Sequence, residues 1–480
     1  MKNPPHLIFI LADDMGYGDL SCLNAESKIH TAHLDRLAAG GMRFRDAHAS
    51  SAVCTPSRYS ILTGRYNWRS ALKEGVTHGF SGPLIEEGRL TMASLLQQHG
   101  YTTAAIGKWH LGWDWAKSGI APTDVDYSKP ITHGPCANGF DYFFGISASL
   151  DMPPYVYVEN DRVTAPPDRE FPGATGFAFC RRGPIAPNFR HADVLPELTR
   201  RAEAFLARQT AARPFFLYFP LPAPHTPILP APEFQGKSGT NPYGDFCLMV
   251  DDVVGRVMAA VERAGLTENT ILVFTADNGC SPKADFPGLE KLGHRPSYVF
   301  RGHKADIYEG GHRIPLLVRW PAAIRAGSAC DATVCLVDWL ATLADILGVR
   351  LPDNAGEDSV SLLPAFRAPQ SASRMPVVHH SIDGSFSIRQ GRWKLELCPG
   401  SGGWSWPRPG KECEGLPPIQ LYDLTADIGE RRNVQHEHPD VVAHLTGLLT
   451  RYVRDGRSTP GTPQPNTGPA DWPQLAWMRR

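Results

Sequence analysis

Strand-length runs of apolar residues alternate with helical patterns along most of this chain. The runs cover residues 7–12, 102–106, 214–219, 270–275 and 315–320, and apolar side chains recur at helical spacing over 34–39, 91–99, 244–266 and 335–347. A strand that is apolar at every position is typical of a sheet covered on both faces, which is the usual environment of parallel strands. The sequence therefore predicts an α/β fold in which a large, mostly parallel central sheet is sandwiched by helices.

The pattern changes near residue 364. Beyond it, short strands are expected at 377–381, 386–389, 393–397 and 420–424, then a helix at 440–453 and a tail at 458–469 rich in Pro, Thr and Gly. Short strands separated by turn residues are typical of an antiparallel sheet. We therefore divide the chain into an α/β domain at 1–364 and a small C-terminal α+β subdomain at 365–480, which carries an antiparallel sheet, a helix and an extended tail.

Charge and hydropathy exclude several classes of partner. The 480 residues include 48 Lys and Arg against 49 Asp and Glu, so the net charge is −1 and no basic run is present. This balance argues against nucleic-acid or membrane partners, and no apolar run approaches the roughly 18 residues that span a bilayer. The first 12 residues resemble a short signal peptide but lead directly into an acidic pair without a small-residue cleavage site. We interpret them as a core strand, which predicts a cytoplasmic protein, or a periplasmic or secreted one if an export signal has been removed.

Oxygen-bearing side chains follow two of the predicted strands. The run at 7–12 leads into Asp13 and Asp14, and the run at 270–275 leads, after Ala276, into Asp277 and Asn278. Either pair alone would more often form a cap or a turn. Together, at the carboxyl ends of strands where α/β proteins bind ligands, three carboxylates and an amide oxygen suit Ca²⁺ or Mg²⁺ rather than zinc.

One of the ten cysteines stands out from the rest. The cysteines are scattered, with no C-x-x-C pair, and we expect most of them to be buried small residues. Cys54, however, begins the run Cys-Thr-Pro-Ser-Arg, and Pro56 suits the first turn of a helix. Cys54 would then lie at a helix N-terminus, where free N–H groups favour an anion. A cysteine of low pKa or a buried structural cysteine would fit the same position.

Taken with its surroundings, this run resembles the signature of a known enzyme family. C-T-P-S-R at 54–58 and L-T-G-R at 62–65 resemble the signature of the type I, formylglycine-dependent sulfatases of the alkaline-phosphatase superfamily. Further elements match at G-K-W-H-L-G (107–112), P-H-T-P (224–227), R-G-H-K (301–304) and L-Y-D-L (421–424) with Glu430 and Asn433. Within that family the chain resembles arylsulfatase A-like and N-acetylgalactosamine-6-sulfatase-like members. The resemblance implies a sulfuric ester hydrolase.

The resemblance also implies a cofactor, a modification and a set of roles. Cys54 would be oxidised to formylglycine by a maturation enzyme, and one Ca²⁺, or Mg²⁺, would bind Asp13, Asp14, Asp277, Asn278 and the modified Cys54. Lys108 and Lys304 would surround the sulfate oxygens, and Arg58 would hold the formylglycine diol. His110 would be the base that releases sulfate, and His225 the acid that protonates the leaving alcohol.

Several alternatives stay open at this point. A phosphonate or phosphate monoester hydrolase of the same superfamily could share these residues, although one cation and two lysines better suit a monoanionic sulfate. A generic arylsulfatase is a second alternative. A non-catalytic binding protein would result if Cys54 were left unconverted.

The expected substrate is a small-molecule or glycan sulfate ester, for which we favour exo-acting hydrolysis of a galactose or N-acetylgalactosamine 6-sulfate. Candidate substrate-binding residues lie in polar loops near the matching elements, although each could equally stabilise its own loop: His78, Ser149, Asp151, His303 and His380. Trp404 and Trp406 could stack on a sugar ring or fill a packed loop.

Overall fold

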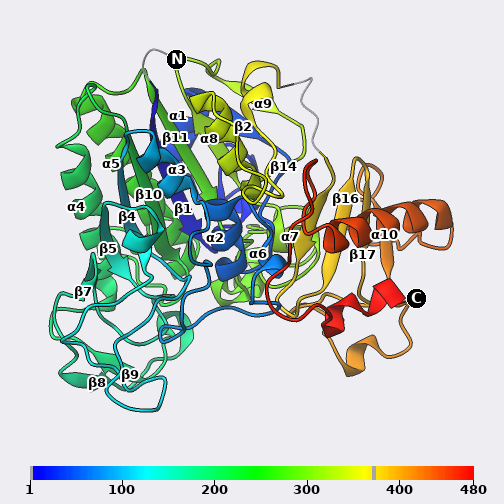
Figure 1. Ribbon diagram of the computed structural model, residues 1–480, viewed down its shortest axis with the longest axis horizontal. Helices are drawn as coiled ribbons and strands as arrows, with labels where there is room; N and C mark the ends of the chain where they lie inside the picture. Colours follow the sequence, from blue (N-terminus) through cyan, green and yellow to red (C-terminus); the bar gives the residue numbers. More distant parts are fainter. Residues whose placement is uncertain (1–3, 370–374, 480) are drawn as a thin grey trace.

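A ten-stranded sheet forms the centre of the protein. The computed structural model describes residues 4–369 and 375–479, and its strands follow the order β13-β2-β12-β11-β1-β10-β4-β5-β6-β7 (Figure 1). The strands are β1 (His6–Asp13), β2 (Met42–Phe44), β4 (Thr102–Lys108), β5 (Tyr142–Ile146), β6 (Val158–Glu159), β7 (Arg162–Val163), β10 (Phe215–Pro224), β11 (Thr270–Ala276), β12 (Leu316–Arg319) and β13 (Ser328–Cys330).

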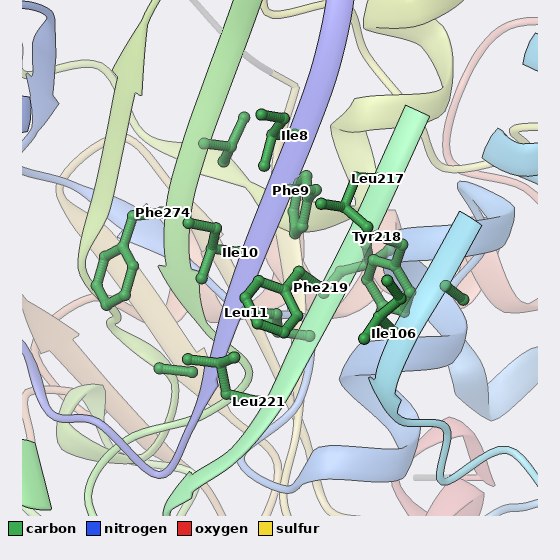
Figure 2. Close-up of a cluster of buried hydrophobic side chains, with 14 of the residues drawn as sticks. Ile8, Phe9, Ile10, Leu11, Ile106, Leu217, Tyr218, Phe219, Leu221 and Phe274 are labelled. Atoms are coloured by element: carbon green, nitrogen blue, oxygen red, sulfur yellow. The ribbon is translucent and has the colours of Figure 1, made fainter. Parts of the chain in front are cut away.

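The five central strands, β11, β1, β10, β4 and β5, run parallel, whereas the β11–β12, β12–β2, β5–β6 and β6–β7 pairs are antiparallel. Every residue of β1, β10 and β11 is buried. Figure 2 shows apolar side chains of β1, among them Ile8 and Leu11, packed among those of the neighbouring strands, with Leu11 beside Phe219 of β10. The prediction of a large, mostly parallel sheet is confirmed.

Helices cover both faces of this sheet. One layer contains α1 (Ala32–Ala39), α4 (Val194–Leu206) and α5 (Pro242–Arg263), and the other contains α2 (Cys54–Thr63), α3 (Met92–Gln98) and α8 (Trp339–Leu347). Three shorter helices are α6 (Phe286–Lys291), α7 (Glu309–His312) and α9 (Leu363–Arg367). Helix α4 was not predicted, because Pro196 and several charged residues interrupt its apolar pattern. Among the described residues, no helix has both the length and the apolar character needed to cross a membrane.

The C-terminal part has its own sheet and helix. Strands β15 (Val377–His380), β16 (Phe386–Gln390), β17 (Trp393–Glu396) and β18 (Gln420–Asp423) form an antiparallel sheet in chain order, covered by α10 (Pro439–Arg454) (Figure 1, orange and red). Two further pairs are β3 (Ala47–His48) with β14 (Val334–Cys335) and β8 (Arg169–Phe171) with β9 (Gly183–Ile185). The core beneath α10 includes Tyr66 and Trp68 from the first part of the chain, so the division at 364/365 stays a prediction.

Three buried histidines join the two parts. His48 of β3, His312 of α7 and His379 of β15 are fully buried. Nδ1 of His48 lies 3.1 Å from Nδ1 of His312, whose ring stacks on His379 at 3.8 Å between centroids. Burial is the main cause that lowers the pKa of all three rings. The rings are therefore neutral in the folded protein at neutral pH.

This histidine cluster predicts a loss of stability in mild acid. Unfolded histidines take up protons below pH ~6.5, whereas the folded rings resist protonation. The unfolded state therefore binds more protons, and the free energy of unfolding falls as pH drops below that value, by up to about 1.4 kcal/mol per ring and pH unit. Urea unfolding between pH 7.5 and 5.5 measures the slope. His379→Gln should reduce it by up to about 1.4 kcal/mol per pH unit, the contribution of one ring, and an unchanged slope would contradict this assignment.

Candidate active site

The two acidic strand ends meet at one edge of the sheet. Strand β1 ends at Asp13 and pairs in parallel with β11, with Ala12 opposite Ala276, so Asp277 and Asn278 follow at the same level. Asp14 has φ 68°, in the left-handed region that side chains other than glycine rarely adopt. All four side chains are essentially inaccessible to solvent. The parallel register thus brings together the four oxygen-bearing residues that the sequence singles out.

The donor set of this edge fits a hard divalent cation. Nδ2 of Asn278 donates to Oδ1 of Asp14 at 2.7 Å, and Oδ1 of Asn278 and Oδ1 of Asp13 are buried without a hydrogen-bond partner among the described residues. Buried acceptors are rarely left unpaired in native proteins. Burial and the charge of Asp13 raise the pKa of Asp277 to about 6. A cation would pair the free oxygens and relieve this repulsion, and an all-oxygen set suits Ca²⁺ or Mg²⁺.

Helix α2 presents Cys54 to the same edge. The helix begins at Cys54, directly after Val53 in extended conformation. It ends at Thr63 and is capped by Gly64, which has φ 64°. The Cys54 side chain is 3% exposed, and its ligand atom forms a close group with those of Asp13 and Asp277. Burial raises the pKa of the Cys54 thiol. At neutral pH the thiol is therefore uncharged and a weak nucleophile. This argues against the alternative of a low-pKa cysteine.

Arg58 and Lys108 hold the carboxylates in place. One turn beyond Cys54, Arg58 donates to Oδ2 of Asp277 at 2.9 Å from Nε and to the carbonyl of Lys108 at 2.9 Å from Nη1. Lys108, at the end of β4, donates to Oδ2 of Asp13 at 2.5 Å and to Oγ of Ser149 at 3.2 Å. Burial opposes the ionisation of Asp13, but the charge of the Lys108 ammonium contributes to holding the pKa of Asp13 below its usual range.

Lys304 completes an electrically balanced centre. Its Nζ lies 2.6 and 2.8 Å from the two oxygens of Asp14. The three carboxylates Asp13, Asp14 and Asp277 are then matched by the cations Arg58, Lys108 and Lys304; counted as charges, −3 and +3 give zero. A divalent cation would leave the site positive, which suits the binding of an anionic ester.

Two histidines with different hydrogen-bond partners flank this centre. His110, with φ 57°, has Nε2 2.8 Å from the carbonyl of Thr77, and its Nδ1 is buried without a described partner. Burial, then the charges of Lys108 and Arg58, hold the pKa of His110 well below its usual value, so Nδ1 is an unprotonated acceptor. His225 follows β10, and its Nε2 lies 3.6 Å from Oδ2 of Asp14 while Nδ1 lies 2.7 Å from the carbonyl of Thr226.

A pocket of about 460 Å³ opens above Cys54. Its wall contains five of the residues selected from the sequence: Cys54, His78, Asp151, His225 and Lys304. It also contains residues that sequence reasoning missed: Met152, Phe179, Arg181 and Lys283. Trp404 belongs to the wall as well, whereas Trp406 is 72% exposed and lies outside it. The one sequence signal for the missed group is the pair Arg181-Arg182 beside several aromatic residues.

Three other predicted substrate residues lie outside this pocket. Ser149 is buried beneath it, between Lys108 and His225. His303 lines a separate pocket of about 260 Å³, where it contacts Ser405. His380 is 1% exposed and its ring packs edge-on against Phe386. The structure therefore brings neither His303 nor His380 into the pocket above Cys54.

Comparison with known proteins gives a consistent family. A family model described as "Sulfatase" matches residues 5–349. An N-acetylgalactosamine-6-O-sulfatase of Bacteroides thetaiotaomicron is 36% identical over 93% of this chain and 92% of that protein. Human arylsulfatase A is 33% identical over 90% of this chain and 84% of that protein.

Solved structures agree with these relatives. A sulfatase structure from Bacteroides thetaiotaomicron, described under the metabolism of multiple glycosaminoglycans, superposes with a TM-score of 0.83 at 34% identity and covers 93% of this chain and 99% of that one. A phosphonate monoester hydrolase of Agrobacterium radiobacter is 20% identical with a TM-score of 0.60, over 93% of this chain and 95% of that one, which shows the shared fold alone.

Proposed function

Because this chain belongs to the sulfatase family and is therefore a sulfuric ester hydrolase, we propose that its substrate is a sulfated sugar attacked at a chain end, with the 6-sulfate of N-acetylgalactosamine or galactose preferred. The observation that carries this proposal is the pocket above Cys54. Lys304 is 5% exposed and Cys54 is 3% exposed, so both lie deep in the pocket. The exposed His78 and the buried Asp151 supply polar groups on its wall. Such a pocket suits one terminal sugar better than a continuous polymer. The relative named N-acetylgalactosamine-6-O-sulfatase supports the choice of sugar.

The proposed chemistry needs two groups beyond the unmodified chain. We infer that a maturation enzyme converts Cys54 to formylglycine and that Asp13, Asp14, Asp277, Asn278 and the modified Cys54 hold one Ca²⁺ or Mg²⁺. The hydrated aldehyde supplies the nucleophilic hydroxyl, and the cation supplies positive charge beside it. The free oxygens of Asp13 and Asn278 support the cation, and the burial of Cys54 between Asp13 and Asp277 supports its place beside that cation.

The chain's own residues then bind the ester and move protons. Lys108 and Lys304 stabilise the charge that spreads over the sulfate oxygens as the S–O bond breaks. Arg58 keeps Asp277 oriented through its 2.9 Å hydrogen bond. Nδ1 of His110 is free to accept a proton, because Nε2 donates to Thr77. His225, which lines the pocket, is the residue that we propose donates a proton to the leaving alcohol.

A panel of substrates tests this proposal. The purified enzyme, produced with the maturation enzyme, is assayed on 6-sulfated galactose and N-acetylgalactosamine, intact sulfated polymers, an aryl sulfate and an aryl phosphate. We expect the terminal 6-sulfated sugars to give the highest kcat/KM. Faster release from internal positions of a polymer would contradict exo action. Activity on the aryl sulfate alone would leave a generic arylsulfatase, and preference for the phosphate would favour the monoester hydrolase alternative.

Variants of the pocket wall sharpen the test. His78→Ala and Asp151→Ala each remove polar groups beside the pocket and should lower kcat/KM on sugar sulfates by about 10- to 100-fold, the cost of one or two buried hydrogen bonds. The aryl sulfate, which lacks sugar hydroxyls, should lose less than about threefold. Equal losses on both substrates would show that these residues support the catalytic centre instead of the sugar.

A further inference from the structure

Two cations and one aromatic ring form part of the pocket wall on the solvent side. The ring of Phe179 has Lys283 Nζ at 5.0 Å and Arg181 Cζ at 5.5 Å from its centroid, and all three residues line the pocket above Cys54. Lys283 is exposed and the Arg181 side chain is 44% exposed, whereas Lys304, on the same pocket, is 5% exposed. We call Phe179, Arg181 and Lys283 the cationic rim of the pocket. The buried end of the pocket, where Lys304 lies, is its floor.

The rim carries an unbalanced positive charge. Arg181 pairs with Asp151, which is the one carboxylate among the described residues lining the pocket. Lys283 forms no ion pair with any carboxylate in the described ranges. The count at the mouth is therefore +1 for Arg181, +1 for Lys283 and −1 for Asp151, which leaves +1. At the floor, by contrast, Lys304 is already matched by Asp14.

The sulfate ester that reacts does not account for this charge. Its oxygens must reach Cys54 and Lys304 at the floor, where His225 also lies and where the fully buried Lys108 donates to Ser149, the residue that also contacts His225. Lys283 is on another segment, the short turn Pro282–Ala284, which contacts the turn Gly176–Ala178 next to Phe179. A cation at the mouth of a pocket with a buried anion site suits a second anionic group of the ligand.

We propose that the cationic rim binds a second anionic substituent of the substrate, a sulfate or a carboxylate, so that the preferred substrate carries two negative groups. This rests on the proposed function as a carbohydrate sulfatase. One source is a second sulfate on the terminal sugar, and the other is the carboxylate of a uronic acid as the next sugar. Either group offers the planar or tetrahedral set of oxygens that Arg181 and Lys283 can contact.

Steady-state kinetics on three substrates test the proposal: N-acetylgalactosamine 6-sulfate, its 4,6-disulfate, and a disaccharide in which the 6-sulfated sugar is followed by a uronic acid. We expect KM at low salt to be about 5- to 10-fold lower for at least one dianionic substrate, and the difference to shrink in 0.5 M NaCl through screening. The substrate that gains identifies the source of the second anion.

Variants of one residue separate the rim from the rest of the pocket. Lys283→Ala should remove the advantage of the dianionic substrate, and Lys283→Arg should retain it. The matched control is Lys291→Ala, because Lys291 is an exposed lysine of α6 that lies outside the pocket. Equal KM for all three substrates, or an advantage that survives Lys283→Ala, would overturn the rim proposal alone. If none of the sugars is hydrolysed while the aryl sulfate is, the proposed function fails, and the rim proposal with it.

Discussion

Replacing Cys54 by alanine is expected to abolish sulfate ester hydrolysis, with a loss of about 10⁴-fold or more in kcat, as for other nucleophile deletions. Cys54 lies at the first position of α2 with its side chain in contact with the acidic edge of the sheet. Alanine is smaller and favours helix, so the protein should still fold. Circular dichroism and the thermal midpoint check the fold, and release of sulfate from an aryl sulfate measures the activity.

A second measurement shows whether the thiol itself has a role. Cys54→Ser retains a group of similar size but is not expected to be converted to an aldehyde in a system that oxidises cysteine, so it should be as inactive as the alanine variant. Peptide mass spectrometry of the wild-type enzyme should find the aldehyde or its hydrate at position 54. Cys136→Ser, at an exposed cysteine, is the control and should retain full activity. Full activity from protein with an unmodified Cys54 thiol would contradict the formylglycine proposal.

The parts of the fold that could be predicted are those in which local sequence and burial agree. The strands β1 and β11 are buried at every position because helices cover both of their faces, and the apolar runs within them are visible without the structure. Their parallel pairing then places Asp13 beside Asp277, although 264 residues separate them in the chain. Chemistry at the strand ends was therefore predictable from two short segments.

The pocket wall was less predictable, because it depends on contacts between distant loops. Arg181 reaches Asp151 from a stretch without strand or helix periodicity, and no local pattern shows that these two residues meet. His303 and His380 lie next to residues of the site in sequence or in space, yet the ring of His303 faces Ser405 and that of His380 faces Phe386. Proximity to a motif predicts the neighbourhood of a side chain but not its direction.

Removal of the divalent cation is expected to inactivate the enzyme and to lower its thermal midpoint. Asp13, Asp14 and Asp277 are fully buried, and burial, together with the charges of Asp13 and Asp14, raises the pKa of Asp277 to about 6. A cation that binds only the folded state adds about 2.7 kcal/mol of stability at 100 times its Kd. After dialysis against a chelator, activity and the thermal midpoint should both fall, and both should return with Ca²⁺ or Mg²⁺.

Substitution of one ligand should remove both effects together. Asp277→Ala takes away a proposed ligand and the partner of Arg58, so we expect at least about a 100-fold loss of activity and a thermal midpoint that no longer responds to Ca²⁺. Asp345→Ala, at an exposed position of α8, should behave as wild type in both assays. Elemental analysis of the purified wild-type protein should give one divalent ion per chain. Two tightly bound zinc ions per chain would contradict the proposed site, because a single all-oxygen centre holds one hard cation. A thermal midpoint of Asp277→Ala that still rises with Ca²⁺ would also contradict it, because the proposed centre needs Asp277 to hold the cation.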